Sequence, residues 1–205
     1  SIYDFETNRP LVFGKIFDQV IKELENDNPV EIRAHQGTMQ EIMAYLEKTI
    51  DGNSIHPDVP FLADQKSVDL TRSLNYHYKN KIRDVELATS ERLNELFHDE
   101  KQAYVRFAKV GTQTLQEDRG IVIQADANQG YKKHGPFFTL DNHRFFACTA
   151  AHSSFTNVMK YVHAVEPELV IVDGTRASTS IAKELCLSIA DQEHILAIPQ
   201  YCSYD

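Results

Sequence analysis

One segment near the C-terminus constrains the fold of this chain more than any other part: a strand, a helix and a second strand in direct succession. The first strand is expected at the apolar run 145–148, and residues 156–165 carry apolar side chains at helical spacing. The second strand is expected at 169–172, directly after Pro167 and Glu168. Strands joined by a helix form a parallel α/β unit, so the sequence predicts an α/β fold.

Polar residues follow or end both of these strands. His152, Ser153 and Ser154 follow the first strand, and Asp173 ends the second, directly before Gly174. Ligands of open α/β sheets bind outside the carboxyl ends of the strands, so we expect His152 and Asp173 to face one crevice. An imidazole can ligate a metal, donate to a phosphate oxygen or protonate a leaving group. The alternative is a histidine that only begins the following helix and is hydrogen-bonded by its neighbours.

The same stretch resembles the C-terminal part of nucleases in the metallo-β-lactamase/β-CASP family, which includes Artemis-type DNA nucleases and the RNA 3′-end-processing endonuclease. Members carry small residues, a His with hydroxyl or acid neighbours, a helix that ends at a Pro turn, and an apolar strand. That order is found at 149–155, Glu166-Pro167 and 170–174. The resemblance is strongest over 120–176, and a weaker likeness covers the first 50 residues.

The resemblance implies roles for the polar residues. His152 would lie beside the scissile phosphate and the zinc pair. Asp173 stands where RNA-cleaving relatives have a metal-binding His and DNA-cleaving relatives tend to have Val. A carboxylate can ligate zinc, magnesium or manganese. The alternative is that Asp173 only begins a turn with Gly174. One of Ser153 and Ser154 is expected to cap the following helix, and the other could reach a phosphate.

Several further residues are weaker candidates. Lys132 and Lys133 lie in a Gly-flanked polar loop, and Lys15 follows Gly14 near the beginning of a helix. Each could contact a phosphate backbone, although a solvated surface position is the competing interpretation. His35 ends a predicted strand and could face the crevice, or be a surface or interdomain residue.

The family's zinc motif, His-x-His-x-Asp-His, does not occur in the 205 residues, and the nine histidines are scattered singly. We therefore expect a β-CASP-like α/β module at 1–118 and, at 119–205, strands and helices that complete a metallo-β-lactamase-like layered sheet. Zinc, manganese or magnesium would be held mostly by ligands outside this chain. The favoured hypothesis is a metal-dependent nuclease acting on RNA or DNA, with the missing half or a partner subunit as its complement. The alternative is a metal-free, non-catalytic module that binds a protein or nucleic acid.

Composition sets limits on these hypotheses. The formal net charge of −9 counts against a protein that simply coats nucleic acid. Hydrophobic residues make up 42% of the chain, yet no apolar run approaches the length of a membrane span, so no membrane partner is expected. Three widely spaced cysteines without a CxxC pair favour a reducing intracellular compartment. Because the first residue is Ser rather than Met, we expect a chain that was processed, tagged or taken from a longer one.

The remaining elements follow from periodicity and turn residues. The region 67–102 is the least legible and is expected to hold one or two helices, with a helix beginning at Thr89 or Ser90. Residues 126–136 are expected to form a polar loop. Other expected helices are 11–25, 39–50 and 178–190; other expected strands are 30–34, 104–110, 120–125 and 194–199, with a hairpin formed by 137–140 and 144–148.

Overall fold

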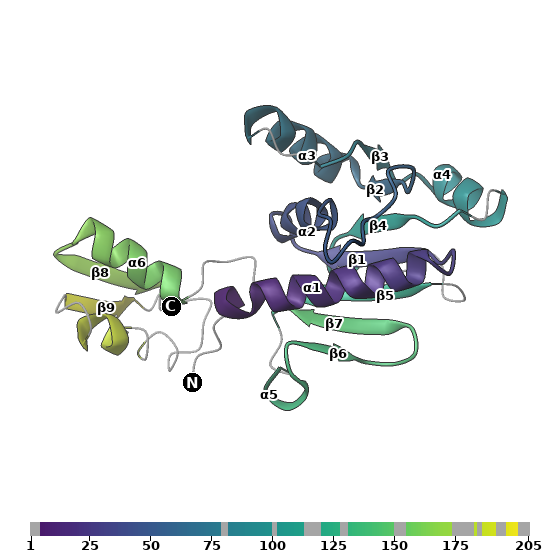
Figure 1. The fold of residues 1–205 in the computed structure, drawn as a ribbon. Helices are drawn as coiled ribbons and strands as arrows, with labels where there is room; N and C mark the ends of the chain where they lie inside the picture. Colours follow the sequence, from purple (N-terminus) through teal and green to yellow (C-terminus); the bar gives the residue numbers. More distant parts are fainter. Residues whose placement is uncertain are drawn as a thin grey trace, which may run out of the picture. The chain divides into compact units, whose positions relative to one another are not determined.

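The computed structural model describes residues 5–78, 82–99, 102–112, 120–127, 131–149, 155–173, 183, 186–191 and 196–200. The chain divides into two compact units, Phe5–His152 and the combination of Ser1–Asp4 with Ser153–Asp205. Each unit has its own sheet (Figure 1). Helices and mostly parallel strands confirm the α/β class.

The larger unit is built on a mixed sheet. Its strands are β1 (Val30–Ala34), β2 (Phe61–Ala63), β3 (Val85–Leu87), β4 (Val105–Ala108), β5 (Ile121–Asp126), β6 (Phe137–Thr139) and β7 (Arg144–Cys148). They form one seven-stranded sheet in the order β3-β2-β4-β1-β5-β7-β6. All neighbouring strands are parallel except β6 and β7, which form the predicted antiparallel hairpin.

The three longest helices of the larger unit pack into the main core on one face of this sheet. The helical elements of the larger unit are α1 (Phe5–Leu24), α2 (Thr38–Leu46), α3 (Gln65–Tyr78), α4 (Ser90–Asn94), the π-helical turn η1 (Glu95–Asp99) and α5 (Tyr131–His134). Val30, Ile32 and Ala34 of β1 are fully buried and belong to the same apolar cluster as Ile16 of α1 and Met39 of α2. Successive strand residues point to opposite faces, so these three define the face that the helices cover.

The opposite face of the sheet carries charge beside a small second core. Glu31 is 7% exposed, and its two carboxylate oxygens accept from Arg33 Nε at 2.6 Å and Arg106 Nη1 at 2.8 Å. Leu62 of β2 faces the same side and packs with Leu93 of α4 and neighbouring residues. Two cationic partners satisfy the buried Glu31 carboxylate, which would be strongly destabilising alone.

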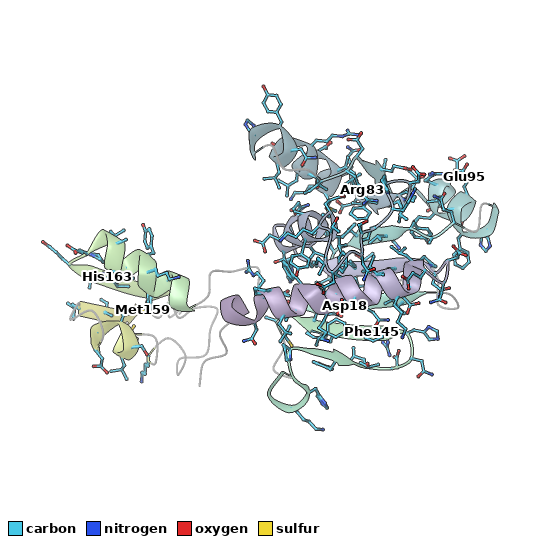
Figure 2. The ribbon with its side chains drawn as sticks, in the orientation of Figure 1. Asp18, Arg83, Glu95, Phe145, Met159 and His163 are labelled. Atoms are coloured by element: carbon cyan, nitrogen blue, oxygen red, sulfur yellow. The ribbon has the colours of Figure 1, made fainter. Side chains whose placement is uncertain are left out.

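Arg83 joins the segment before β3 to the loop that precedes β2 (Figure 2). Its Nε donates to Glu47 Oε1 at 2.7 Å, and its Nη1 donates to the carbonyl oxygens of His56 at 2.8 Å and Val59 at 2.9 Å. The guanidinium carbon lies 4.3 Å from the ring centroid of Phe61. One half-buried side chain therefore holds the C-terminal end of α2, a loop and β2 together.

The smaller unit contains α6 (Phe155–Val165) and the parallel strands β8 (Leu169–Asp173) and β9 (Leu196–Gln200). Residues 186–191 are helical. Met159 and Val162 of α6 pack with Ile189 against one face of the two strands, which presents Val170, Val172 and Ala197 (Figure 2 labels Met159). This unit contains the predicted helix after residue 155 and the predicted strand at 169–172. The prediction that the strands at 145–148 and 169–172 form one parallel unit is wrong, because β7 belongs to the seven-stranded sheet and β8 pairs with β9 in a separate sheet.

The structure also corrects several predicted elements. No strand was predicted at β2 or β3, and β3 lies within 67–102, where one or two helices were expected. The helix predicted at 11–25 begins at Phe5 and contains Pro10, the helix predicted at 39–50 ends at Leu46, and the loop at 126–136 includes the short helix α5. Thr89 caps α4 by accepting from the Arg92 N–H, as predicted.

The sheet continues across the predicted boundary at residue 118. β5 pairs with β1, and β7 pairs with β5, so residues on both sides of 118 belong to one sheet. The compact unit accordingly extends to His152. The assignment of 1–118 to a β-CASP-like module and of 119–205 to a metallo-β-lactamase-like half stays a prediction.

Candidate functional site

The sequence-predicted site residues are only partly visible in the structure. His152, Ser153 and Ser154 lie outside the described residues. Asp173 is the last residue of β8, opposite Gln200 of β9, and its side chain lies outside the described part.

The predicted basic residues lie on two different helices. Lys15 is exposed on α1, and Lys133 is exposed on α5. Lys132 also belongs to α5, but its side chain is not described. Lys15 lies in the middle of α1 rather than near its beginning, and Lys132 and Lys133 lie on a short helix rather than in a loop. A phosphate contact by any of the three lysines stays a prediction.

The larger sheet has a topological switch point between β1 and β5. These strands are adjacent and parallel, but the chain leaves them in opposite directions. After β1 it passes through α2 toward β2, on one side of the sheet order; after β5 it passes through α5 toward β6 and β7, on the other (Figure 1). Open α/β sheets bind ligands at the carboxyl ends of strands that diverge in this way.

Two titratable side chains meet at this switch point. His35 directly follows the last residue of β1, and Asp126 is the last residue of β5. His35 Nε2 lies 3.4 Å from Asp126 Oδ1, and the two side chains are 56% and 26% exposed. Asp126 Oδ1 also accepts from the Ala127 N–H at 2.7 Å. His35 was a candidate from the sequence and Asp126 was not, because only the pairing of β1 with β5 brings the two together.

The turn that joins β1 to α2 follows the carboxyl end of β1. Gly37 has a φ of 92°, a conformation that favours glycine, and its N–H donates to Gln40 Oε1 at 2.9 Å. This bond holds the Gln40 carboxamide against the first turn of α2. Gln40 is 3% exposed, and among the described residues its Nε2 has no hydrogen-bond partner. Gln36 Nε2 is likewise buried without a partner in that part of the chain.

Thr149 places another polar group beside Asp126. It directly follows β7, and its N–H donates to the Asp126 carbonyl oxygen at 3.0 Å. The residue is 3% exposed, and its hydroxyl Oγ1 has no hydrogen-bond partner within the described ranges. The ends of β1, β5 and β7 therefore present an imidazole, a carboxylate, two carboxamides and a hydroxyl.

An ion pair continues this polar edge across the neighbouring strands. Asp64 follows β2 and Lys109 follows β4, with 3.4 Å between Lys109 Nζ and Asp64 Oδ2. Asp64 Oδ1 accepts from the Ser67 N–H at 2.8 Å. Partial burial raises the pKa of the Asp64 carboxyl, but hydrogen bonds from Ser67 and the Lys109 ammonium outweigh it, so the pKa lies below its ordinary value.

The described residues do not form a zinc site by themselves. Protein zinc sites use three or four His, Cys, Asp or Glu ligands, and the described part of the chain contains no group of three such residues with suitable positions. His35 and Asp126 supply only two.

Comparison with known protein families and with curated proteins found no match to this chain. None of the described helices is long and apolar enough to cross a membrane.

Proposed function

We propose that this chain is part of a metal-dependent phosphodiesterase that cleaves RNA or DNA. The observation that carries the proposal is the order of residues along 145–174: a strand, His152, a helix, and a strand that ends in Asp173. The resemblance to metallo-β-lactamase/β-CASP nucleases is strongest there. The elements on which that order depends are β7, α6 and β8. Asp173 lies at the carboxyl end of β8, where ligands of parallel strands bind.

The proposed roles follow from the chemistry of the two side chains. His152 would hold the phosphate or protonate the leaving oxygen, because an imidazole exchanges protons near neutral pH. Asp173 would contribute one carboxylate to a metal site whose other ligands come from outside residues 1–205. In such enzymes the metal ion activates a water molecule and stabilises charge on the phosphate. We assign no step of the reaction to a metal held by the described residues alone.

The surface of the smaller unit supports the proposal that this chain is one part of a larger assembly. The face of β8 and β9 that points away from α6 carries four aliphatic side chains: Leu169, Ile171, Leu196 and Ile198 are 43%, 56%, 64% and 42% exposed. Parallel strands in proteins are usually covered on both faces. The remaining part of a metallo-β-lactamase-like domain would cover this aliphatic face.

The test is cleavage of matched RNA and DNA oligonucleotides by the complete protein. His152→Ala should lower the cleavage rate by about 10²–10⁴-fold, the usual contribution of a general acid or base. Its melting temperature should stay within a few degrees of that of the wild type. Near-normal cleavage by the variant, or loss of its fold, would show that His152 is a structural residue.

A second function is favoured by the absence of His-x-His-x-Asp-His from the printed sequence. The chain would then be a non-catalytic module that binds a protein or nucleic acid. The same oligonucleotides separate the two hypotheses: a binding module retains them but leaves them intact with zinc, manganese and magnesium alike. Cleavage that requires one of these ions excludes the binding-module hypothesis.

A further inference from the structure

We propose that the carboxyl ends of β1, β5 and β7 form a binding site for a phosphate-bearing ligand. This site would consist of His35, Gln36, Gln40, Asp126 and Thr149, and thus of residues other than His152 and Asp173. It does not rest on the proposed nuclease activity.

The strand topology favours a ligand site at the ends of β1 and β5. The chain diverges after β1 and β5, so the loops that follow these adjacent strands lead away from each other. Such a divergence leaves a crevice outside the strand ends, which is where open α/β sheets bind ligands. His35 and Asp126, with 3.4 Å between their side-chain atoms, lie at this divergence.

Several buried side-chain polar atoms at this edge of the sheet have no hydrogen-bond partner within the described part of the chain. Within the described part of the chain, six buried side-chain polar atoms lack a partner, and those of Gln36, Gln40 and Thr149 follow the ends of β1 and β7. Native proteins leave few such atoms, and each requires an explanation, such as water, an ion or a ligand. Three of them at one edge of one sheet indicate a shared partner.

The donors also define the chemistry of that partner. Gln40 Oε1 accepts from the Gly37 N–H at 2.9 Å, so the Gln40 carboxamide lies at the N-terminus of α2 with its NH₂ group left to donate. The Thr149 hydroxyl and the His35 imidazole can donate as well. A helix N-terminus attracts negative charge. A ligand with several acceptor oxygens and negative charge, such as a phosphate monoester, satisfies all of these groups.

The nearby carboxylates do not oppose this assignment. Asp126 Oδ1 accepts from the Ala127 N–H at 2.7 Å and lies 3.4 Å from His35 Nε2, so local partners already occupy this oxygen. Asp64, farther along the edge, is paired with Lys109 at 3.4 Å. The phosphate can belong to a free nucleotide or to a nucleic-acid strand, because both offer the same acceptor oxygens.

The experiment is a titration of the 205-residue chain, followed by NMR or calorimetry. The probes are inorganic phosphate, a 5′-mononucleotide, and one oligonucleotide with and without a 5′-phosphate. Gln40→Glu keeps the acceptor for Gly37 but replaces the free NH₂ group by a carboxylate oxygen, so phosphate binding should weaken at least about tenfold. Thr149→Val, which removes only the hydroxyl, should weaken binding in the same direction.

Lys22→Ala is the matched control, because Lys22 is an exposed cation in the last turn of α1 and should leave binding unchanged. If Gln40→Glu fails to fold, Thr149→Val decides the question. Binding of the mononucleotide and not of the oligonucleotide identifies a free nucleotide as the ligand, and the reverse identifies a strand. Absence of binding by every phosphate probe, or binding that both site variants leave intact, would overturn the proposal.

Discussion

Replacement of Gly120 by Ala should destabilise the larger unit more than replacement of any other described glycine with a positive φ. Gly120 directly precedes β5 and has a φ of 85°. A Cβ atom added there would lie 2.0 Å from the carbonyl oxygen of Pro29, the residue before β1. The Ile121 N–H donates to this same oxygen at 3.2 Å. The clash therefore falls on backbone at the point where the two central strands begin their pairing.

The magnitude has two parts. The left-handed conformation costs an L-residue about 1–2 kcal/mol relative to glycine. The overlap adds about 1–3 kcal/mol, as for other overpacked positions, because the two strands must separate. Gly120→Ala should thus lower the free energy of unfolding by about 2–5 kcal/mol. Gly111→Ala measures the cost of the left-handed conformation alone. Gly111 has a φ of 87°, and a Cβ added there meets no atom within 4 Å.

The assay is urea unfolding of the wild type and both variants, followed by circular dichroism. With unchanged m-values, the midpoints report the free energies directly. Gly111→Ala should lose only about 1–2 kcal/mol. Equal losses for the two variants would show that the contact with Pro29 does not contribute, and the reasoning from the close approach of β1 and β5 would be wrong.

Three further predictions concern charged residues. Arg83→Ala should lower the free energy of unfolding in urea by about 2–4 kcal/mol, because its charge-assisted hydrogen bonds to Glu47 and to two carbonyl groups are lost together. Arg92→Ala, which removes only exposed ion pairs, should lower it by about 0–1 kcal/mol. The pKa of Asp64 is lower in the folded state than in the unfolded state. The ionised Asp64 carboxylate therefore stabilises the fold above the ordinary carboxyl pKa, and this contribution is lost as the pH falls through the pKa of the folded state. The difference in unfolding free energy between wild type and Asp64→Asn should disappear when unfolding is measured at increasingly acidic pH. In the complete protein, Asp173→His should tighten metal binding and Asp173→Val should weaken it, measured as metal-dependent cleavage of RNA and DNA; one common metal profile would leave Asp173 as a turn residue.

Local sequence patterns predicted those strands and helices whose apolar and polar residues alternate or recur at regular spacing. β5 alternates buried and partly exposed residues along its length, and α6 has one apolar face, so both were predicted near their observed positions. β2 and β3 contain three residues each, too few to show an alternation, and β2 is buried on both faces. Tertiary pairing with β4 makes β2 a strand, and that pairing joins residues far apart in the sequence.

The two candidate sites differ in the same way, because one can be found from a local sequence pattern and the other depends on the order of strands in the sheet. His152 and Asp173 could be selected because each lies at the end of an apolar run within one strand–helix–strand segment. The contact of His35 with Asp126 depends on β5 lying beside β1, although β4 comes between them in the sequence. No local pattern determines that strand order, so Asp126 appeared in the sequence only as the first residue of a polar loop.

The polar edge at β1, β5 and β7 is difficult to explain by stability alone. A partly exposed pair such as His35 and Asp126 contributes about 0–1 kcal/mol, whereas each buried donor left without a partner costs about 1–3 kcal/mol. Valine at Thr149 would fill a similar volume without that cost. Proteins break such local rules chiefly at functional sites, where a ligand completes the hydrogen bonds. Three of the six buried side-chain polar atoms without a partner in the described part of the chain follow the ends of β1 and β7, as we expect of a binding site.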